Sequence, residues 1–201
     1  MVDIIPFEEN LFQHRNKVRI AKAPGERFLT VPLLWLKKGE LICNMEIDNT
    51  KSWREEHWNL ILSSYEKAPY FKTYAPFFED VYRREWTMLV DLNEFMLKEI
   101  LNFFGIKTEL LLASRLGINV DEKDIHVQIC KKVGATRYMS GKGVCDYLDK
   151  KTLATAGIEH LIQQFIHPTY PQIHGGFVGH MAAIDLLFNC GPESIQYLKY
   201  E

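Results

Sequence analysis

The chain has 201 residues, of which 47% are apolar and 25% are charged, a balance that excludes a disordered chain, a collagen and a disulfide-rich mini-protein. Its 24 Lys and Arg residues against 26 Asp and Glu residues give a net charge of −2, without the basic surplus typical of nucleic-acid-binding proteins. No apolar run approaches the ~20 residues of a membrane helix and no secretory leader is recognisable, so we expect a cytoplasmic protein without a membrane span. Four cysteines lack metal-ligand spacing and are expected to be reduced and packed: Cys43, Cys130, Cys145 and Cys190.

The first part of the chain, residues 1–50, is rich in β-branched and aromatic residues. These residue types favour strands, and we predict three strands at residues 2–7, 27–35 and 41–47. Pro24-Gly25 is typical of a turn between the first two strands. A small antiparallel sheet is the simplest arrangement of this part.

The second part, residues 51–105, is predicted to be helical. Ser52 begins a capping-box pattern and predicts a helix start, and Pro69 ends that helix after Ala68. Apolar side chains at helical spacing predict another helix over residues 88–104, where Gly105 can supply the left-handed residue after its end.

The third part, residues 106–201, alternates strand and helix. The strands are predicted at 109–113, 136–139 and 158–166, and the helices at 121–133, 144–156 and 177–188. Short strands separated by helices imply right-handed crossovers and a parallel sheet. The predicted fold class is therefore α/β, three-layer, with a short parallel βαβαβ sheet in the C-terminal half, a small antiparallel element at the N-terminus and helices between. All three parts are assigned to one domain, residues 1–201.

Ligands of an open parallel sheet bind beyond the carboxyl ends of its strands, and this rule selects three loops. The first strand leads into Ser114-Arg115, the second into Ser140-Gly141-Lys142-Gly143 and the third into residues 167–172. We expect Ser114, Lys142 and His167 to emerge side by side at a common rim. The second loop is suited to a phosphate, because its glycines free backbone N–H groups, a helix follows and Lys142 adds a positive charge. A tight strand-to-helix turn is the alternative.

The third loop carries the predicted catalytic residues, His167, Tyr170 and Gln172. Histidine is the natural general base near neutral pH, and Pro168 limits the conformations of the loop. A loop histidine that binds backbone carbonyls is the alternative. The spacing of His167, His174 and His180 matches no zinc pattern, so no metal is predicted, and the sequence does not define which cofactor, if any, is bound.

Further residues are candidates for binding a substrate. Arg15 and Asn16, and Arg19 near them, can pair with a carboxylate or a phosphate, although a solvated arginine is the alternative. His57 lies in mid-helix, where a packed histidine is equally expected. Asp185 lies among apolar residues, so we expect its carboxylate to be hydrogen-bonded, with a structural role in holding a loop as the stronger interpretation. No GxSxG or Cys-His motif supports a covalent mechanism.

Several stretches occur in an order that resembles the WbqC-like family of bacterial proteins. Among them are residues 12–18, 29–32, 65–71, 135–143 (Ala-Thr-Arg-Tyr-Met-Ser-Gly-Lys-Gly), 167–172 (His-Pro-Thr-Tyr-Pro-Gln) and 184–191. Together they cover nearly the whole chain. Members of this family usually open with a strand and a His-Gln-Pro-x-Tyr-x-Pro loop, and this sequence is expected to start after that segment.

The resemblance implies a setting in the biosynthesis of O-antigen and other surface polysaccharides. It suggests a transferase that moves an acyl or aminoacyl group onto the amine of a nucleotide-activated amino sugar, with the nucleotide sugar as its small-molecule partner. The alternatives are a non-catalytic binding protein or subunit of a polysaccharide assembly, and another small-molecule transferase such as a methyltransferase. Ser114-Arg115 stands where a methyltransferase would have a glycine-rich turn, which weighs against the last alternative. Whether the protein forms a homo-oligomer stays open.

Overall fold

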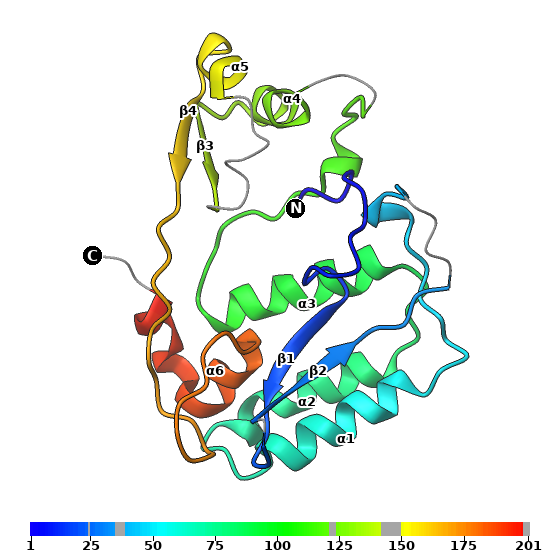
Figure 1. Cartoon of the computed structure of the whole chain (residues 1–201), viewed down its shortest axis with the longest axis vertical. Helices are drawn as coiled ribbons and strands as arrows, with labels where there is room; N and C mark the ends of the chain where they lie inside the picture. Colours follow the sequence, from blue (N-terminus) through cyan, green and yellow to red (C-terminus); the bar gives the residue numbers. More distant parts are fainter. Residues whose placement is uncertain (24, 35–38, 121–123, 142–149, 199–201) are drawn as a thin grey trace. The chain divides into compact units, whose positions relative to one another are not determined.

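The computed structural model of the chain describes residues 1–23, 25–34, 39–120, 124–141 and 150–198. The chain divides into two compact units. Unit 1 consists of Met1–Ile4 and Leu110–Ile166, and unit 2 consists of Ile5–Glu109 and His167–Glu201. Each unit is described by itself below (Figure 1).

Unit 2 contains an antiparallel hairpin of β1 (Arg15–Arg19) and β2 (Glu26–Thr30). The predicted turn is present, with Gly25 at a φ of +91° that favours glycine. The strand that pairs with β2 is β1, however, and the prediction of a strand at residues 2–7 was wrong. Pro6 forms only an isolated bridge with Leu41, in keeping with its lack of a backbone N–H for a sheet ladder.

The predicted strand at residues 41–47 is a short 3₁₀ helix, η1 (Ile42–Asn44), followed by isolated bridges. The N–H groups of Asn44 and Met45 donate to the carbonyls of Leu41 and Ile42, which closes turns instead of a ladder. The alternation in this segment does bury Met45 and Ile47. Alternating burial therefore arose here from a turn and a bridge rather than from a strand.

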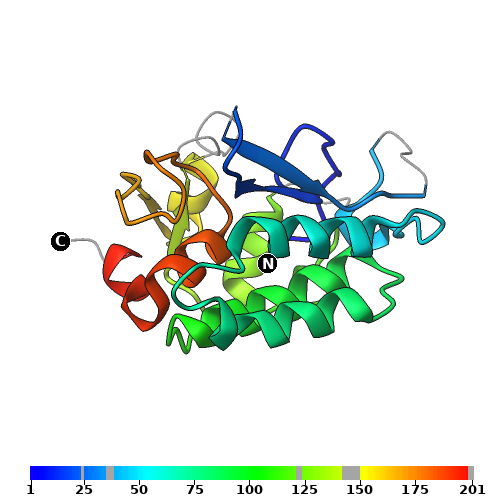
Figure 2. The same cartoon turned by 90° about the horizontal axis from the view of Figure 1, so that it is seen from below.

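Three helices form the body of unit 2: α1 (Trp53–Tyr65), α2 (Phe71–Arg83) and α3 (Leu89–Phe103). Helix α1 follows Ser52 as predicted, although the Ser52 side chain makes no capping hydrogen bond. Helix α3 confirms the prediction for residues 88–104, and Gly105 adopts a φ of +69° after its end. Helix α2 was not predicted. Figure 2 shows the hairpin lying along one side of these helices, next to α1.

The last helix of unit 2, α6 (Ala183–Cys190), begins later than predicted and continues into the 3₁₀ helix η4 (Gly191–Leu198). Residues 177–182 are irregular, and His180 among them has a left-handed φ of +62° that a right-handed helix does not admit. Helix α6 packs against α2, α3 and β1. The core of unit 2 is strongly aromatic, with Tyr65, Phe78 and Phe188 fully buried.

Unit 1 contains a parallel pair of strands, β3 (Arg137–Ser140) and β4 (Glu159–Ile162), with α4 (Ile125–Lys132) before β3 and α5 (Lys150–Thr155) between the strands. Figure 1 shows β3 and β4 running side by side in the same direction. The small core of this unit contains the buried side chains of Val127, Cys130, Leu153 and Ile158. The α/β class is confirmed, with one antiparallel and one parallel two-stranded sheet.

The strand predicted at residues 109–113 is absent, so the described parallel sheet has two strands and not three. This segment is extended and ends in the 3₁₀ helix η2 (Ala113–Arg115). Its backbone groups bond to the first residue of the chain: the Ala113 N–H donates to the Met1 carbonyl, and the Met1 amino group donates to the Leu111 carbonyl. Parts of two predicted helices, residues 121–123 and 144–149, lie outside the described residues. Within the described ranges, no helix has the length and apolar character needed to cross a membrane.

Candidate functional site

A buried carboxylate, that of Asp185 in the first turn of α6, lies at the centre of a hydrogen-bond network in unit 2. It is fully buried, and it accepts three side-chain hydrogen bonds. The Tyr65 hydroxyl donates to Oδ1 at 2.7 Å, and the Tyr170 hydroxyl and the Gln172 amide donate to Oδ2 at 2.9 Å and 2.8 Å. The carboxylate therefore connects α1, α6 and the loop of residues 167–180, which we call the histidine loop.

The two tyrosines keep their protons in this arrangement. Burial, and secondarily the negative charge of Asp185, raises the pKa of Tyr65 and of Tyr170 far above the ordinary value of a phenol. Both hydroxyls therefore remain donors to the carboxylate across the physiological pH range. The expectation that Asp185 is hydrogen-bonded and holds a loop agrees with these contacts.

Amide side chains fix the rest of the histidine loop. The Gln172 amide bonds both the N–H and the carbonyl of Val178, at 2.9 Å each, and so closes the loop on itself. Asn189 accepts a hydrogen bond from the Ile173 N–H at 2.8 Å and donates to the Asp185 carbonyl at 2.7 Å. These two amide side chains hold the backbone of the loop in place, although its surface is partly exposed.

Arg19, at the end of β1, connects the hairpin to the same loop. Its guanidinium group donates to the carbonyls of Ile20 at 2.6 Å, Gly25 at 2.7 Å and Gly175 at 2.8 Å. A Cβ at Gly25 would lie 2.7 Å from the Arg19 Nη1 atom, so the glycine also makes room for this buried arginine. Arg19 was expected either to pair with a carboxylate or phosphate or to be solvated, whereas in the structure it is buried and its guanidinium group donates to backbone carbonyls.

Two imidazoles lie together on the histidine loop. His167 Nδ1 is 2.8 Å from the Pro168 carbonyl and its Nε2 accepts the His180 N–H at 2.9 Å, a pattern that assigns the proton to Nδ1. The ring of His180 is 4.7 Å from that of His167, and its side chain is exposed. Phe177 packs edge-on against Tyr170 beside them. His180 therefore offers its imidazole to solvent, whereas both nitrogens of His167 are engaged.

The structure thus brings together the three predicted catalytic residues, His167, Tyr170 and Gln172, with Asp185. The polar atoms of Tyr170 and Gln172 are committed to Asp185 and to the loop backbone. A catalytic role for these residues and a substrate-binding role for Asp185 stay predictions. His180 is the residue of this cluster that sequence reasoning undervalued, because a histidine beside glycines gives no signal of where its ring points.

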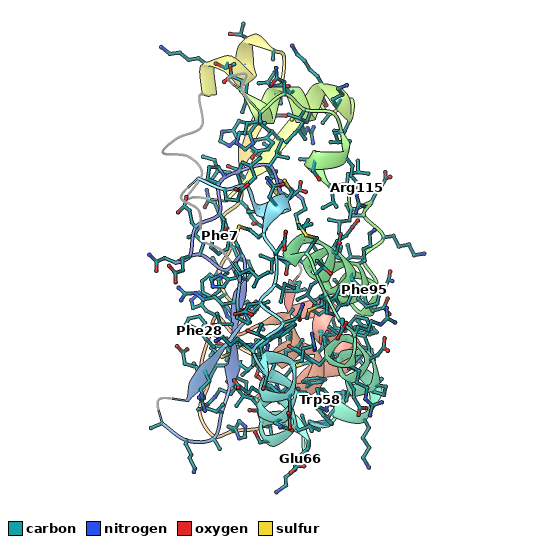
Figure 3. The ribbon with its side chains drawn as sticks, turned by 90° about the vertical axis from the view of Figure 1, so that its right-hand side faces the viewer. Phe7, Phe28, Trp58, Glu66, Phe95 and Arg115 are labelled. Atoms are coloured by element: carbon teal, nitrogen blue, oxygen red, sulfur yellow. The ribbon has the colours of Figure 1, made fainter. Side chains whose placement is uncertain are left out.

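Arg15 and Asn16 lie on β1. The Arg15 guanidinium donates to the Asn10 carbonyl at 2.8 Å and lies over the Phe28 ring, 4.8 Å from its centroid. Figure 3 labels Phe28 on the side of the hairpin that faces away from helices α1–α3. The Asn16 side chain accepts the Lys17 N–H at 2.8 Å. Substrate binding by Arg15 and Asn16 stays a prediction.

His57 is a packed histidine of α1. It is buried, its Nε2 lies 3.1 Å from the Thr30 carbonyl, and the rings of Trp53 and Tyr82 meet it edge-on at 5.4 Å and 5.7 Å. Burial lowers the pKa of His57 to about 4, and the bond to Thr30 offsets this only in part. The neutral form with a proton on Nε2 fits these contacts, so the packed alternative agrees with the geometry, and substrate binding stays a prediction.

The remaining predicted residues belong to unit 1. Ser114 is held by Asp3, a fully buried carboxylate that accepts the Ser114 N–H at 3.0 Å and the Ser114 hydroxyl at 2.5 Å. Arg115 is the last residue of η2. Ser140 ends β3, and its Oγ lies 2.8 Å from the Nε2 of His160 on β4, a contact that the sequence did not indicate.

The common rim of Ser114, Lys142 and His167 stays a prediction. Lys142 and Gly143 lie outside the described residues, and Gly141 is described as exposed. Ser114 and His167 belong to different units. The substrate-binding roles of Ser114, Arg115 and the 140–143 loop also stay predictions.

Each unit contains a cavity of about 470 Å³ that no predicted site residue lines. In unit 2 it lies at the start of α1, among Lys51, Arg54, Trp58 and Tyr82. In unit 1 it lies between α4 and α5 and is lined by residues such as Gln128 and Thr152. Among the residues that the structure describes, no group of three or more His, Cys, Asp or Glu side chains is arranged to hold a metal ion.

Comparison with known proteins gives the family of the chain. Residues 1–197 match the WbqC-like protein family. The chain is also similar to the uncharacterized protein Rv1507c of Mycobacterium tuberculosis, with 30% identity over 191 residues, which cover 92% of this chain and 81% of that protein. No solved structure was found to match. Given the family match over nearly its whole length, the chain belongs to the WbqC-like protein family.

Proposed function

We propose that this protein is a transferase that acts on a nucleotide-activated amino sugar in surface polysaccharide biosynthesis. The group transferred is an acyl or aminoacyl group, and the acceptor is the amine of the sugar. Membership of the WbqC-like family supports the setting, by the resemblance described above. The observation that carries the chemistry is the pair of imidazoles on the rigid histidine loop.

Acyl transfer to an amine requires a group that removes a proton. The amine nitrogen attacks the acyl carbon, the leaving group departs, and the nitrogen must lose one proton to give the neutral amide. His180 can accept that proton, since its imidazole is exposed and its ring nitrogens have no hydrogen bond among the described residues. His167, the predicted catalytic histidine, is the second candidate base, and its Nε2 would first have to release the His180 N–H. Phe177 is exposed beside the imidazoles and offers an aromatic face on which a sugar or a base can pack.

Thermal unfolding in the presence of UDP- and dTDP-amino sugars tests the proposal. We expect at least one of these nucleotide sugars to raise the melting temperature, because a ligand that binds only the folded state stabilises it. His180→Gln should keep the ligand-induced shift and lose transfer from an acyl thioester, whereas Lys142→Ala should lose the shift. The absence of any shift across a broad panel of nucleotide sugars would contradict the proposal.

A non-catalytic subunit of a polysaccharide assembly is the second candidate. It is favoured by exposed apolar side chains in unit 1, where Met139 is 61% exposed and Ile166 is 83% exposed. This candidate predicts that the protein purifies together with an enzyme of the same gene cluster. It also predicts that Met139→Ser and Ile166→Ser release that enzyme.

A further inference from the structure

Unit 1 contains a set of polar side chains that the proposed function does not use. Ser140 Oγ lies 2.8 Å from His160 Nε2, and the Tyr138 hydroxyl lies 3.0 Å from Nδ1 of His126. The rings of Tyr138 and His160 are stacked, with their centroids 5.9 Å apart. Tyr138 and Ser140 are alternate residues of β3, and His160 pairs with Tyr138 across the parallel strands, so all three side chains share one face.

This arrangement holds the His160 ring in place. Burial lowers the pKa of His126, which favours the neutral imidazole whose Nδ1 can accept the Tyr138 O–H. That hydrogen bond fixes the Tyr138 ring, and the ring in turn covers one face of His160. The nitrogen that faces Ser140 is therefore presented in a defined direction, as a general base must be.

Ser140 lies where a parallel sheet carries its chemistry, and His160, the second residue of β4, reaches it from the neighbouring strand. Ser140 is the last residue of β3, and the next residue, Gly141, is exposed. Ser140 itself is 6% exposed, and its carbonyl accepts the Gln163 N–H at 2.8 Å. Low exposure to bulk water disfavours hydrolysis of an ester formed on this hydroxyl.

We propose that Ser140 is an acyl-accepting nucleophile with His160 as its general base. The acyl donor is a thioester, the class that an acyl transfer of the kind proposed above would use. The inference rests on the proposed function only for that choice of donor, since it involves residues of unit 1 alone. It goes beyond the histidine loop because it introduces a covalent intermediate.

The acyl group moves from the thioester to Ser140 and then to the amine. Ser140 Oγ attacks the thioester carbonyl carbon, and its proton passes to His160 Nε2. The C–S bond breaks, the proton moves from His160 to the departing sulfur, and the products are the acyl ester of Ser140 and a free thiol. In this transfer, which is separate from the one proposed at the histidine loop, an amine then attacks the ester carbon, His160 accepts a proton from the nitrogen and returns it to Oγ, and an amide leaves while the Ser140 hydroxyl is restored.

A fluorophosphonate probe tests the pair without any sugar or acyl donor, because an activated serine displaces fluoride and gains the phosphonyl group. Intact mass and peptide mapping of the full chain should place one adduct on Ser140. Ser140→Ala should give no adduct. His160→Gln can retain a hydrogen bond to Ser140 but cannot act as the base, so we expect its labelling rate to fall by about 100-fold or more.

Ser63→Ala is the matched control, because Ser63 is an exposed serine of α1 and its loss should leave the labelling rate unchanged. If folded His160→Gln is labelled as fast as the unsubstituted chain, the proposal is contradicted. The contact between Ser140 and His160 would then be a structural hydrogen bond only. The unsubstituted chain tests the proposal even where a variant fails to fold. If it gives no adduct on Ser140, Ser140 is not an activated nucleophile and the proposal is contradicted. That failure would leave the melting shift with nucleotide sugars unaffected, so it is distinguishable from failure of the proposed function.

Discussion

The two units use buried polar side chains in different ways. In unit 2, Asp185 is fully buried and its carboxylate accepts three side-chain donors from two other segments of the chain. In unit 1, Ser140 at the end of β3 meets His160, the second residue of β4, across a pair of four-residue strands beside a small core. The first arrangement joins segments that are far apart in the sequence, whereas the second presents one nitrogen to one hydroxyl.

The comparison indicates where stability and chemistry reside. The carboxylate of Asp185 is costly to remove, because the buried Tyr65 and Tyr170 hydroxyls are then left without an acceptor in a low-dielectric environment. A serine–histidine pair near a strand end can be altered with less effect on folding, because fewer groups depend on it. We therefore expect substitutions at Asp185 to act mainly on stability and substitutions at His160 to act mainly on reactivity.

Asp185→Ala should give the largest effect, because it leaves the buried Tyr65 and Tyr170 hydroxyls without an acceptor and the Gln172 amide with the Val178 carbonyl alone. We expect the free energy of unfolding to fall by about 4 kcal/mol, measured by urea unfolding. Asp185→Asn should fall between this variant and the unsubstituted chain, since one acceptor oxygen remains. The control is Asp80→Asn, because Asp80 is exposed and pairs with Arg84 only on the surface of α2. A loss at Asp185 no larger than that of the control would contradict the central role of the carboxylate.

His57 should make the largest pH-dependent contribution to the free energy of unfolding. Its pKa is lowered from 6.5 to about 4 in the folded state, so the unfolded chain binds the proton more tightly. The stability that this residue contributes is therefore complete above pH 6.5 and is lost as the pH falls from 6.5 to about 4. The loss should reach about 3 kcal/mol by linkage.

The comparison variant is His57→Gln, which can keep a donor toward the Thr30 carbonyl and does not titrate. The measurement is the difference in unfolding free energy between the two proteins at pH 7, 5.5 and 4.5, because other histidines contribute equally to both. Equal slopes for the two proteins would show that His57 is not held neutral by the fold.

The sequence allowed prediction of features that depend on local signals. The α3 helix, its Gly105 terminus and the alternation of β3, α5 and β4 follow from periodicity and from helix stop signals. The segments that failed depend on partners elsewhere in the chain. The leucines before Ala113 have strand-like composition, but their backbone is paired with Met1, and this could not be deduced from local pattern.

The same distinction applies to the candidate site. The cluster of His167, Tyr170 and Gln172 could be predicted because the three residues are close in the sequence. The partners that define their roles, Tyr65 and Asp185, lie 105 and 15 positions from Tyr170, and their contacts appear only after folding. His160 was missed for the same reason, since Ser140 is 20 positions away and no short motif joins them.

Ser114→Ala should have a moderate effect, confined to unit 1. It removes the hydroxyl that donates to Asp3, while the Ser114 N–H keeps its bond to the other carboxylate oxygen. We expect a loss of about 1–2 kcal/mol in the free energy of unfolding, because Asp3 is buried and retains one donor. Urea unfolding checks this, and Ser114→Thr, which restores a hydroxyl, should recover part of the loss. If Ser114→Ala costs as much as Asp185→Ala, the two buried carboxylates are equivalent and the contrast between the units fails.

Removal of the Arg137–Glu159 pair should have the smallest effect. This ion pair joins β3 and β4 with an N···O distance of 3.2 Å, but the two side chains are 72% and 59% exposed. Water and salt screen such a pair, so Arg137→Ala should change the free energy of unfolding by less than about 0.5 kcal/mol, and 0.5 M salt should remove most of that difference. The fluorophosphonate labelling of Ser140 should be unchanged in this variant, because Arg137 lies on the opposite face of β3. A slower labelling rate would mean that the surface pair, and not the stack of Tyr138 on His160, sets the position of the imidazole.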